Sequence, residues 1–191
     1  MKFGNYIADS VKGNKYNKFP DGIQFGIVMH RRIDEFTDNN SIVKSSMALL
    51  KSVYGRYSGV AVDILYDHFL ASQWQQYSDI DLFEFEADFY KIIRENYKLL
   101  PKRMKRFSYY FIKRKRLAGY ASITEIFDVL NKMGIYTSFP KINGDIRDLV
   151  LLNYKQFNEY FNNFFPQLID FSNKFLEYRH FETAKLLKID I

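Results

Sequence analysis

Apolar residues recur at intervals of three and four along most of this chain, which is the spacing of α-helices with one buried face. No stretch shows the strict alternation that is typical of a half-buried strand. The pattern therefore predicts helices over residues 4–13, 22–36, 41–53, 57–76, 82–98, 102–117, 122–133 and 143–180, the last interrupted near Pro166. Residues 134–140 are expected to form a loop.

Helices in this number, joined by short connections, predict an all-α fold, a multi-helix bundle around a shared core. The chain has 191 residues, of which 47% are hydrophobic, so it can bury one sizeable core. We expect a single domain over residues 1–191. The 18% aromatic content argues against disorder, since burial can offset the loss of conformational entropy.

The chain contains no cysteine, which excludes disulfides, thiolate nucleophiles and cysteine-based zinc sites. No apolar run approaches the roughly 20 residues that span a bilayer, and the start lacks the apolar core of a signal peptide. A chain of this kind is typical of the cytoplasm. We therefore expect a cytoplasmic protein.

Positive charge is concentrated in one stretch of the sequence. The formal net charge is +6, yet nine cations lie between residues 98 and 116, where no acidic residue occurs: Lys98, Lys102, Arg103, Lys105, Arg106, Lys113, Arg114, Lys115 and Arg116. A local field of this kind favours encounter with an acidic partner. The alternative is that it is simply the solvated face of a helix.

The expected helix over residues 22–36 carries a histidine and an aspartate on one stripe. Ile23 and Ile27 begin the stripe, and His30 and Asp34 continue it at a spacing of four, so the last two are neighbours. An apolar stripe that becomes polar indicates a helix that leaves the core and opens onto a site. The alternative is a hydrogen-bonded pair without a function.

The expected helix over residues 57–76 carries two carboxylates on an otherwise apolar stripe. Asp63 and Asp67 share this stripe with Val60, Leu70 and Trp74. A buried, ionised carboxylate needs a partner, and a metal ion held jointly with the histidine helix would provide one. The alternative is a salt-bridge network with Arg31, Arg32 or Arg56.

Other mechanisms lose support because their motifs are missing. The sequence has no phosphate-binding loop of the GxxxxGK type, no dinucleotide fingerprint, no GxSxG elbow and no HExxH. A water activated by a metal ion is the nucleophile that remains. Mixed nitrogen and oxygen ligands suit Mn, Fe, Zn or Mg, and an oxygen-rich set favours the harder ions.

Three segments, in this order, resemble the signatures of the acyl carrier protein phosphodiesterases. They are residues 4–13 (GNYIADSVKG), residues 30–34 (HRRID) with 37–39 (TDN), and residues 63–70 (DILYDHFL). The resemblance spans nearly the whole chain. That family is regarded as a divergent relative of the HD phosphohydrolases, so the resemblance implies an HD-phosphohydrolase-like, metal-dependent enzyme.

The resemblance implies a reaction and a set of residues for it. The reaction is hydrolysis of the phosphodiester that joins 4'-phosphopantetheine to a serine of holo acyl carrier protein. The implied metal ligands are Asp9, His30, Asp34, Asp67 and His68, of which the last four are also catalytic candidates. The implied cofactor is a divalent metal, Mn first, with Mg or Fe as alternatives. Candidate cations for the substrate are Lys12, Arg31, Lys113, Arg114 and Lys115.

Two departures from the family pattern and two rival functions complete the expectations. Relatives usually carry an Asn-Phe-Leu-Ala-His segment ahead of residues 4–13, and paired arginines where this chain has Ile135 and Tyr136. Both departures would weaken metal or phosphate binding. The rivals are a nuclease or nucleotide phosphohydrolase, with Tyr109, Tyr110 and Phe111 stacking on bases, and a binding module without activity.

Overall fold

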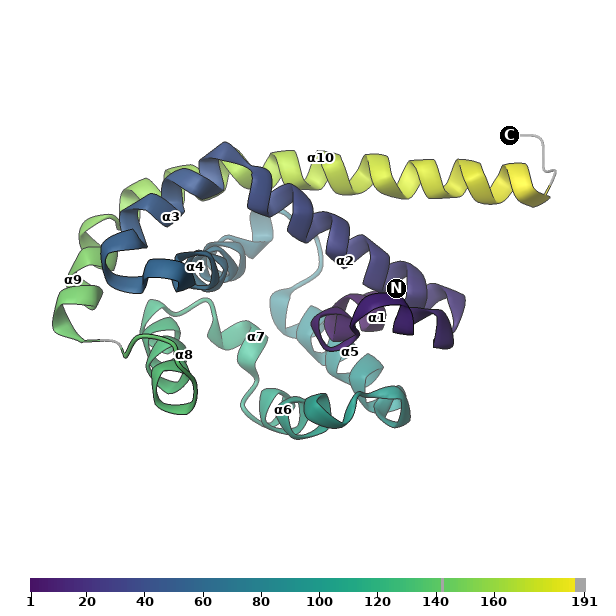
Figure 1. Ribbon diagram of the computed structural model, residues 1–191, viewed down its shortest axis with the longest axis horizontal. Helices are drawn as coiled ribbons and strands as arrows, with labels where there is room; N and C mark the ends of the chain where they lie inside the picture. The colour runs from purple at the N-terminus through teal and green to yellow at the C-terminus, as the bar shows by residue number, and fades with distance from the viewer. Residues whose placement is uncertain (142, 188–191) are drawn as a thin grey trace.

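The computed structural model describes residues 1–141 and 143–187, with side chains through residue 178 apart from that of residue 136. Every regular element in this part of the chain is helical, which confirms the all-α prediction. The α-helices (Figure 1) are α1 (Lys2–Ile7), α2 (Asp21–Asn39), α3 (Ser41–Tyr54), α4 (Ser58–Ser72), α5 (Leu82–Glu95), α6 (Lys102–Lys113), α7 (Arg116–Gly119), α8 (Ile123–Tyr136), α9 (Gly144–Leu152) and α10 (Tyr154–Leu187). Short 3-10 turns cover Ala8–Ser10, Gly13–Lys18, Gly55–Tyr57, Trp74–Gln76 and Tyr97–Leu99.

The first predicted helix ends earlier than expected. It stops at Ile7, and the chain continues through a 3-10 turn into an extended residue, Val11, whose side chain is buried. Gly13 then adopts a φ of 56°, in the left-handed region that glycine tolerates best. The candidate ligand Asp9 therefore lies on a turn and not on a helix.

The predicted break near Pro166 is wrong, because the chain breaks at Asn153 instead. The Asn153 amide donates to the Leu149 carbonyl and ends α9, and α10 runs unbroken through the proline. Phe157, Phe161 and Phe164 bury one face of α10 around that position. Burial of this face offsets the hydrogen bond that the proline removes.

Two of the later helix boundaries also differ from the prediction. Helix α6 ends at Lys113, because Lys115 adopts a left-handed conformation with φ of 45°, and the chain restarts as the short α7. Helix α8 runs on to Tyr136, into the segment expected to be a loop. These two changes place α6, α7 and α8 around a common space.

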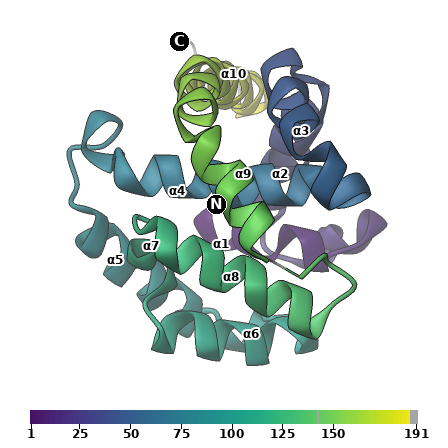
Figure 2. The same cartoon turned by 90° about the vertical axis from the view of Figure 1, so that its left-hand side faces the viewer.

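Two groups of buried residues form the interior. One group lies among α3, α4, α8, α9 and α10 and includes Leu65, Leu130 and Phe161. The other lies among α1, α2, α5 and α6 and includes Ile7, Ile27 and Ile93. Figure 2 shows α3 and α10 on one side of the molecule, α5, α6 and α8 on the other, and α2 and α4 between them. Helix α2 contacts both groups.

Helix α1 packs against α2 through two glycines. A Cβ at Gly4 would collide with the backbone carbonyl of Ile23, and a Cβ at Gly26 with the backbone carbonyl of Met1. The two backbones can approach this closely only without side chains at these positions. This contact brings the turn after α1 alongside the middle of α2. Within the described residues, no helix is both long enough and apolar enough to cross a membrane.

Candidate metal centre

Asp9, His30 and Asp34 come together at the surface of α2. The His30 Nε2 atom lies 3.2 Å from the Asp9 Oδ1 atom and 3.3 Å from the Asp34 Oδ2 atom. His30 and Asp34 are one helical turn apart, as predicted, while Asp9 arrives from the turn after α1. One ring nitrogen therefore sits between two carboxylates from different elements.

The charges of this cluster stabilise one another only in part. The hydrogen bond between His30 and Asp9, together with the nearby Asp34 charge, raises the pKa of His30. The same hydrogen bond lowers the pKa of Asp9. Partial burial instead raises the pKa of Asp34, and the neighbouring Asp9 and Asp38 carboxylates add to this effect. Two acids beside one imidazole leave an excess of negative charge that a cation would balance.

The donor set suits a divalent metal ion. One ligand atom from each of the three residues lies within 4.8 Å of the other two. The cluster is also open, since the side chains of Asp9 and Asp34 are 86% and 50% exposed and that of His30 is 22% exposed. One imidazole nitrogen and two carboxylates are ligands that Mn, Fe, Zn and Mg accept. An ion bound there would remain accessible to substrate.

Further acids extend from this cluster toward α4. Solvent reaches the Asp63 side chain, but the surrounding protein, and next the negative charges of Asp38, Asp34 and Asp9, raise the pKa of Asp63 to about 6. Asp67, one turn further along α4, is influenced in turn by Asp63. The acids predicted on separate helices thus belong to one continuous acidic field across α2 and α4.

Asp67 occupies a narrow, largely apolar cleft. The cleft has a volume of about 70 Å³ and is lined also by Trp74, Phe85, Leu117 and Tyr120. Solvent reaches the side chain, but the surrounding protein, and next the Asp63 charge, raise the pKa of Asp67 to about 7. Asp67 is not one of the residues that cluster within ligand distance of His30. It is poised to exchange a proton near neutral pH.

His68 has an environment unlike that of a ligand. It is 2% exposed; its Nδ1 donates to the Tyr120 carbonyl at 2.8 Å, and its Nε2 accepts from the Tyr154 hydroxyl at 2.8 Å. Burial lowers the pKa of His68, so the ring is neutral. Both nitrogens are occupied, and the residue lies outside the cluster around His30. In this structure His68 joins α4 to α10 and to the segment after α7.

Two candidate substrate cations lie near the cluster. Arg31 donates to the backbone carbonyls of Val11 and Gly13 and stacks over Tyr16. It therefore holds in place the turn that carries Asp9. The Lys12 side chain is exposed on the same turn. Arg31 was expected to contact the substrate, and its bonds to the turn that carries Asp9 could not be predicted from helical periodicity.

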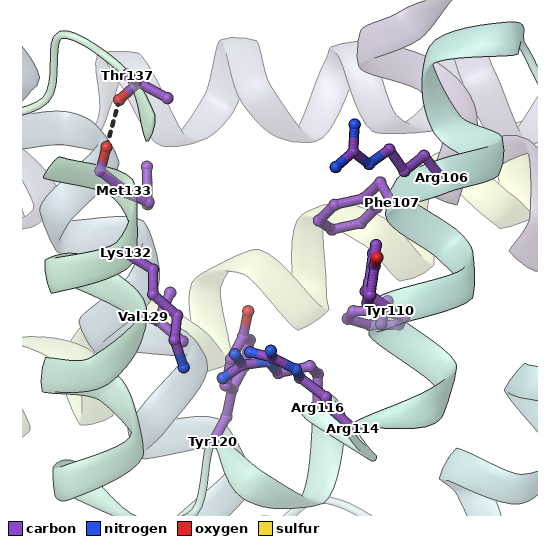
Figure 3. Close-up of a pocket in the computed structure, with 11 residues that line it drawn as sticks. Arg106, Phe107, Tyr110, Arg114, Arg116, Tyr120, Val129, Lys132, Met133 and Thr137 are labelled. Atoms are coloured by element: carbon purple, nitrogen blue, oxygen red, sulfur yellow. Dashed lines mark hydrogen bonds between the residues drawn. The ribbon is translucent and has the colours of Figure 1, made fainter. Parts of the chain in front are cut away.

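The remaining candidate cations lie at the end of α6. Lys113, Arg114 and Lys115 are all exposed, as are the aromatic residues Phe107 and Tyr109 on the same helix. Arg114 also lines a cavity of about 680 Å³ that is formed by α6, α7 and α8. Figure 3 shows this cavity, where Tyr120 projects between the two sides. The sequence analysis did not identify Tyr120 as a candidate functional residue, because it belongs to no motif and to no informative spacing.

Comparisons with known proteins agree with one another. A family model described as acyl carrier protein phosphodiesterase matches residues 1–168. A protein named acyl carrier protein phosphodiesterase in Pectobacterium atrosepticum is 31% identical over 168 residues, which cover 87% of this chain and 86% of that protein. Proteins of the same name in Yersinia pestis and Klebsiella pneumoniae are 31% and 32% identical, over the same shares of both chains.

No solved structure matches this chain. The expected likeness to the HD phosphohydrolases therefore remains a prediction.

Proposed function

This chain belongs to the acyl carrier protein phosphodiesterase family, and we propose that it hydrolyses the phosphodiester between 4'-phosphopantetheine and a serine of holo acyl carrier protein. The observation that carries the proposal is the meeting of Asp9, His30 and Asp34 at one exposed point. Their arrangement supports a hydrolase that depends on a divalent metal, Mn first, with Mg or Fe as alternatives.

Asp9, His30 and Asp34 would hold the ion. Nε2 of His30 would be a nitrogen ligand in its unprotonated form, and the two carboxylates that flank it would supply oxygen. Arg31 keeps the Asp9 turn against α2 and so preserves the spacing of the ligands. When bound, the ion would polarise the phosphodiester and lower the pKa of the attacking water.

Asp67 is suited to protonate the departing serine oxygen. Water attacks phosphorus, the bond from phosphorus to the serine oxygen breaks, and the serine oxygen needs a proton. An acid with a pKa of about 7 holds its proton at neutral pH and can still release it. The apolar walls of the Asp67 cleft, which raise its pKa, support this role.

The basic stretch supports recognition of an acidic carrier protein. On α6 and just after it, Arg103, Lys113 and Lys115 are exposed, and none of them forms an ion pair within the described residues. Free cations on one helix attract an acidic surface at long range and orient its approach. We therefore assign carrier protein docking to the stretch from Lys98 to Arg116.

Mass spectrometry of holo acyl carrier protein, incubated with the Mn-loaded protein, tests the proposal. We expect a loss of mass equal to that of phosphopantetheine less one water, with release of 4'-phosphopantetheine, and no reaction in chelator or with the His30→Ala variant. Single-stranded nucleic acid and nucleotides serve as competing substrates. Their hydrolysis in place of the carrier protein would favour a nuclease, and binding of Mn without any hydrolysis would favour an inactive module.

A further inference from the structure

The cavity between α6, α7 and α8 joins a cluster of cations to an aromatic wall. Its volume of about 680 Å³ is within the usual range for small-molecule sites. Arg114, Arg116 and Lys132 contribute positive charge, and Phe107, Tyr110 and Met133 contribute apolar surface. A ligand that fits both parts carries an anion and a less polar body.

The cations of the cavity are only partly neutralised. Arg116 pairs with Glu125 at 3.6 Å, and Lys132 pairs with Asp128 one helical turn away. Arg106 and Arg114 line the same cavity, and neither pairs with a carboxylate in the part of the chain that the structure describes. The cavity therefore keeps a net positive charge that an anionic ligand would balance.

Figure 3 shows three of the cavity's cations toward one end, while Arg106 lies at the other end beside Phe107. The guanidinium groups of Arg114 and Arg116 lie beside Tyr120, and the Lys132 side chain extends toward them from α8. Phe107 and Tyr110 stand on the opposite wall, which α6 forms. Guanidinium groups bind phosphate and carboxylate oxygens in forked geometry, so the anion expected beside Tyr120 is a phosphate or a carboxylate, and the proposed function favours the phosphate.

Buried contacts fix the charged end of the cavity. Glu86 accepts a hydrogen bond from the backbone N–H of Ala118 in α7. His68 donates a hydrogen bond to the backbone carbonyl of Tyr120, just after α7. Glu86 and His68 are both buried. The segment that carries Arg116 and Tyr120 is therefore held in place before any ligand binds, which lowers the entropic cost of binding.

We infer that this cavity binds the 4'-phosphopantetheine that hydrolysis releases, with its phosphate among Arg114, Arg116 and Lys132 and its pantetheine body along the aromatic wall. The ligand class is an organic phosphate with an elongated, partly apolar body. Its identification as phosphopantetheine rests on the proposed function. The Tyr120 side chain lines both this cavity and the Asp67 cleft, so the charged end of the cavity adjoins the cleft of the proposed acid.

Calorimetric titration with free 4'-phosphopantetheine, in the presence of chelator, tests the cavity without any hydrolysis. We expect saturable binding to the full chain, and at least roughly tenfold weaker binding to Arg114→Gln, because a charge-assisted hydrogen bond to phosphate is lost. The matched control is Arg94→Gln, since Arg94 is an exposed arginine of α5 that does not line the cavity. It should bind as the wild type does.

Two further probes examine the two ends of the ligand. Pantetheine, which lacks the phosphate, should bind at least roughly tenfold more weakly than 4'-phosphopantetheine, and Phe107→Ala should weaken only ligands that carry the pantetheine body. Equal binding of adenosine monophosphate would overturn the assignment in favour of a nucleotide. If Arg94→Gln and Arg114→Gln weaken the binding of 4'-phosphopantetheine equally, the effect is one of general surface charge, and the cavity assignment is overturned.

The cavity assignment and the proposed function can fail separately. If holo acyl carrier protein is hydrolysed but 4'-phosphopantetheine does not bind in chelator, the cavity assignment fails and the proposed function stands. If 4'-phosphopantetheine binds as described but the Mn-loaded protein does not hydrolyse holo carrier protein, the cavity assignment stands and the proposed function fails.

Discussion

The candidate metal centre and the cationic cavity each bring like charges together, but the charges are neutralised to different extents and by different partners. Around His30, two carboxylates share one imidazole and further acids follow along α4, so a negative excess remains. In the cavity, Glu125 and Asp128 neutralise two of the cations, and Arg106 and Arg114 remain free of ion pairs within the described residues. The first region keeps an excess of negative charge, and the second keeps an excess of positive charge.

The two regions also differ in how the chain builds them. Two of the three candidate ligands are one turn apart on a single helix, and the third lies only 21 residues from His30. The cavity needs α6, α7 and α8, a left-handed residue between two of them, and anchors from α4 and α5. Local periodicity can indicate the first kind of site, while the second exists only once distant helices are packed.

Removal of the shared imidazole should have the largest effect. In His30→Ala we expect Mn-dependent hydrolysis of holo carrier protein to fall by more than about a hundredfold, because loss of a ligand costs more than the 10- to 100-fold loss seen for supporting residues. Calorimetric Mn binding should weaken in parallel. The control is Asp88→Ala, an exposed acid of α5. Undiminished Mn binding in His30→Ala would move the metal centre elsewhere.

Asp67→Asn should lower hydrolysis by about a hundredfold or more while Mn still binds. The substitution removes a proton donor, and general acid catalysis contributes about 10²- to 10⁴-fold. The pH–rate profile supplies the check, since the wild type should lose activity as pH rises through about 7, where Asp67 releases its proton. A profile that is unchanged in the variant would exclude Asp67 as the acid.

The same substitution should make the folded state more stable at high pH. The apolar protein around it, and next the Asp63 charge, raise the pKa of Asp67 from 3.8 to about 7, so between about pH 4 and 7 the folded state holds a proton that the unfolded chain has released. The stability of the wild type therefore falls as pH rises through this window. In chelator, Asp67→Asn should raise the melting temperature more at pH 8 than at pH 5. A loss of stability at pH 8 would instead indicate a structural ion pair.

Reversal of two docking charges should have a smaller effect, confined to the protein substrate. We expect Lys113→Glu with Lys115→Glu to raise the KM for holo carrier protein about tenfold at low salt, and added salt to produce the same change in the wild type. Neither residue lines the cavity, so binding of free 4'-phosphopantetheine should stay the same. Equal loss for the free ligand would show that the reversal disturbs the cavity.

Replacement of His68 should have the smallest effect on metal binding. His68→Leu keeps a bulky side chain but leaves the Tyr120 carbonyl and the Tyr154 hydroxyl without their partner, at a cost of about 1–3 kcal/mol in the free energy of unfolding. Chemical denaturation measures this loss. Mn affinity should remain within about twofold of the wild type. A collapse of Mn affinity in a folded variant would restore His68 as a ligand.

Helical periodicity was sufficient for the all-α class and for most helix positions, but not for the chain breaks. The proline at 166 remains inside α10, because burial of its phenylalanine face outweighs one missing hydrogen bond. The breaks at Asn153 and Lys115 depend on side-chain capping and on a left-handed backbone. Neither feature alters the spacing of apolar residues, so the pattern contains no trace of them.

The sequence by itself determined that His30 and Asp34 lie next to each other, because residues four apart on a helix must share a face. It also determined that nine cations lie between residues 98 and 116. The family resemblance implied that Asp9 joins the pair, and the tertiary structure brings it there through the close contact of Gly4 and Gly26. Only the tertiary structure decided that His68 bonds to Tyr120 and Tyr154. Packing decides such pairings, because side chains on one helix can face different neighbours and periodicity does not identify which neighbour is there.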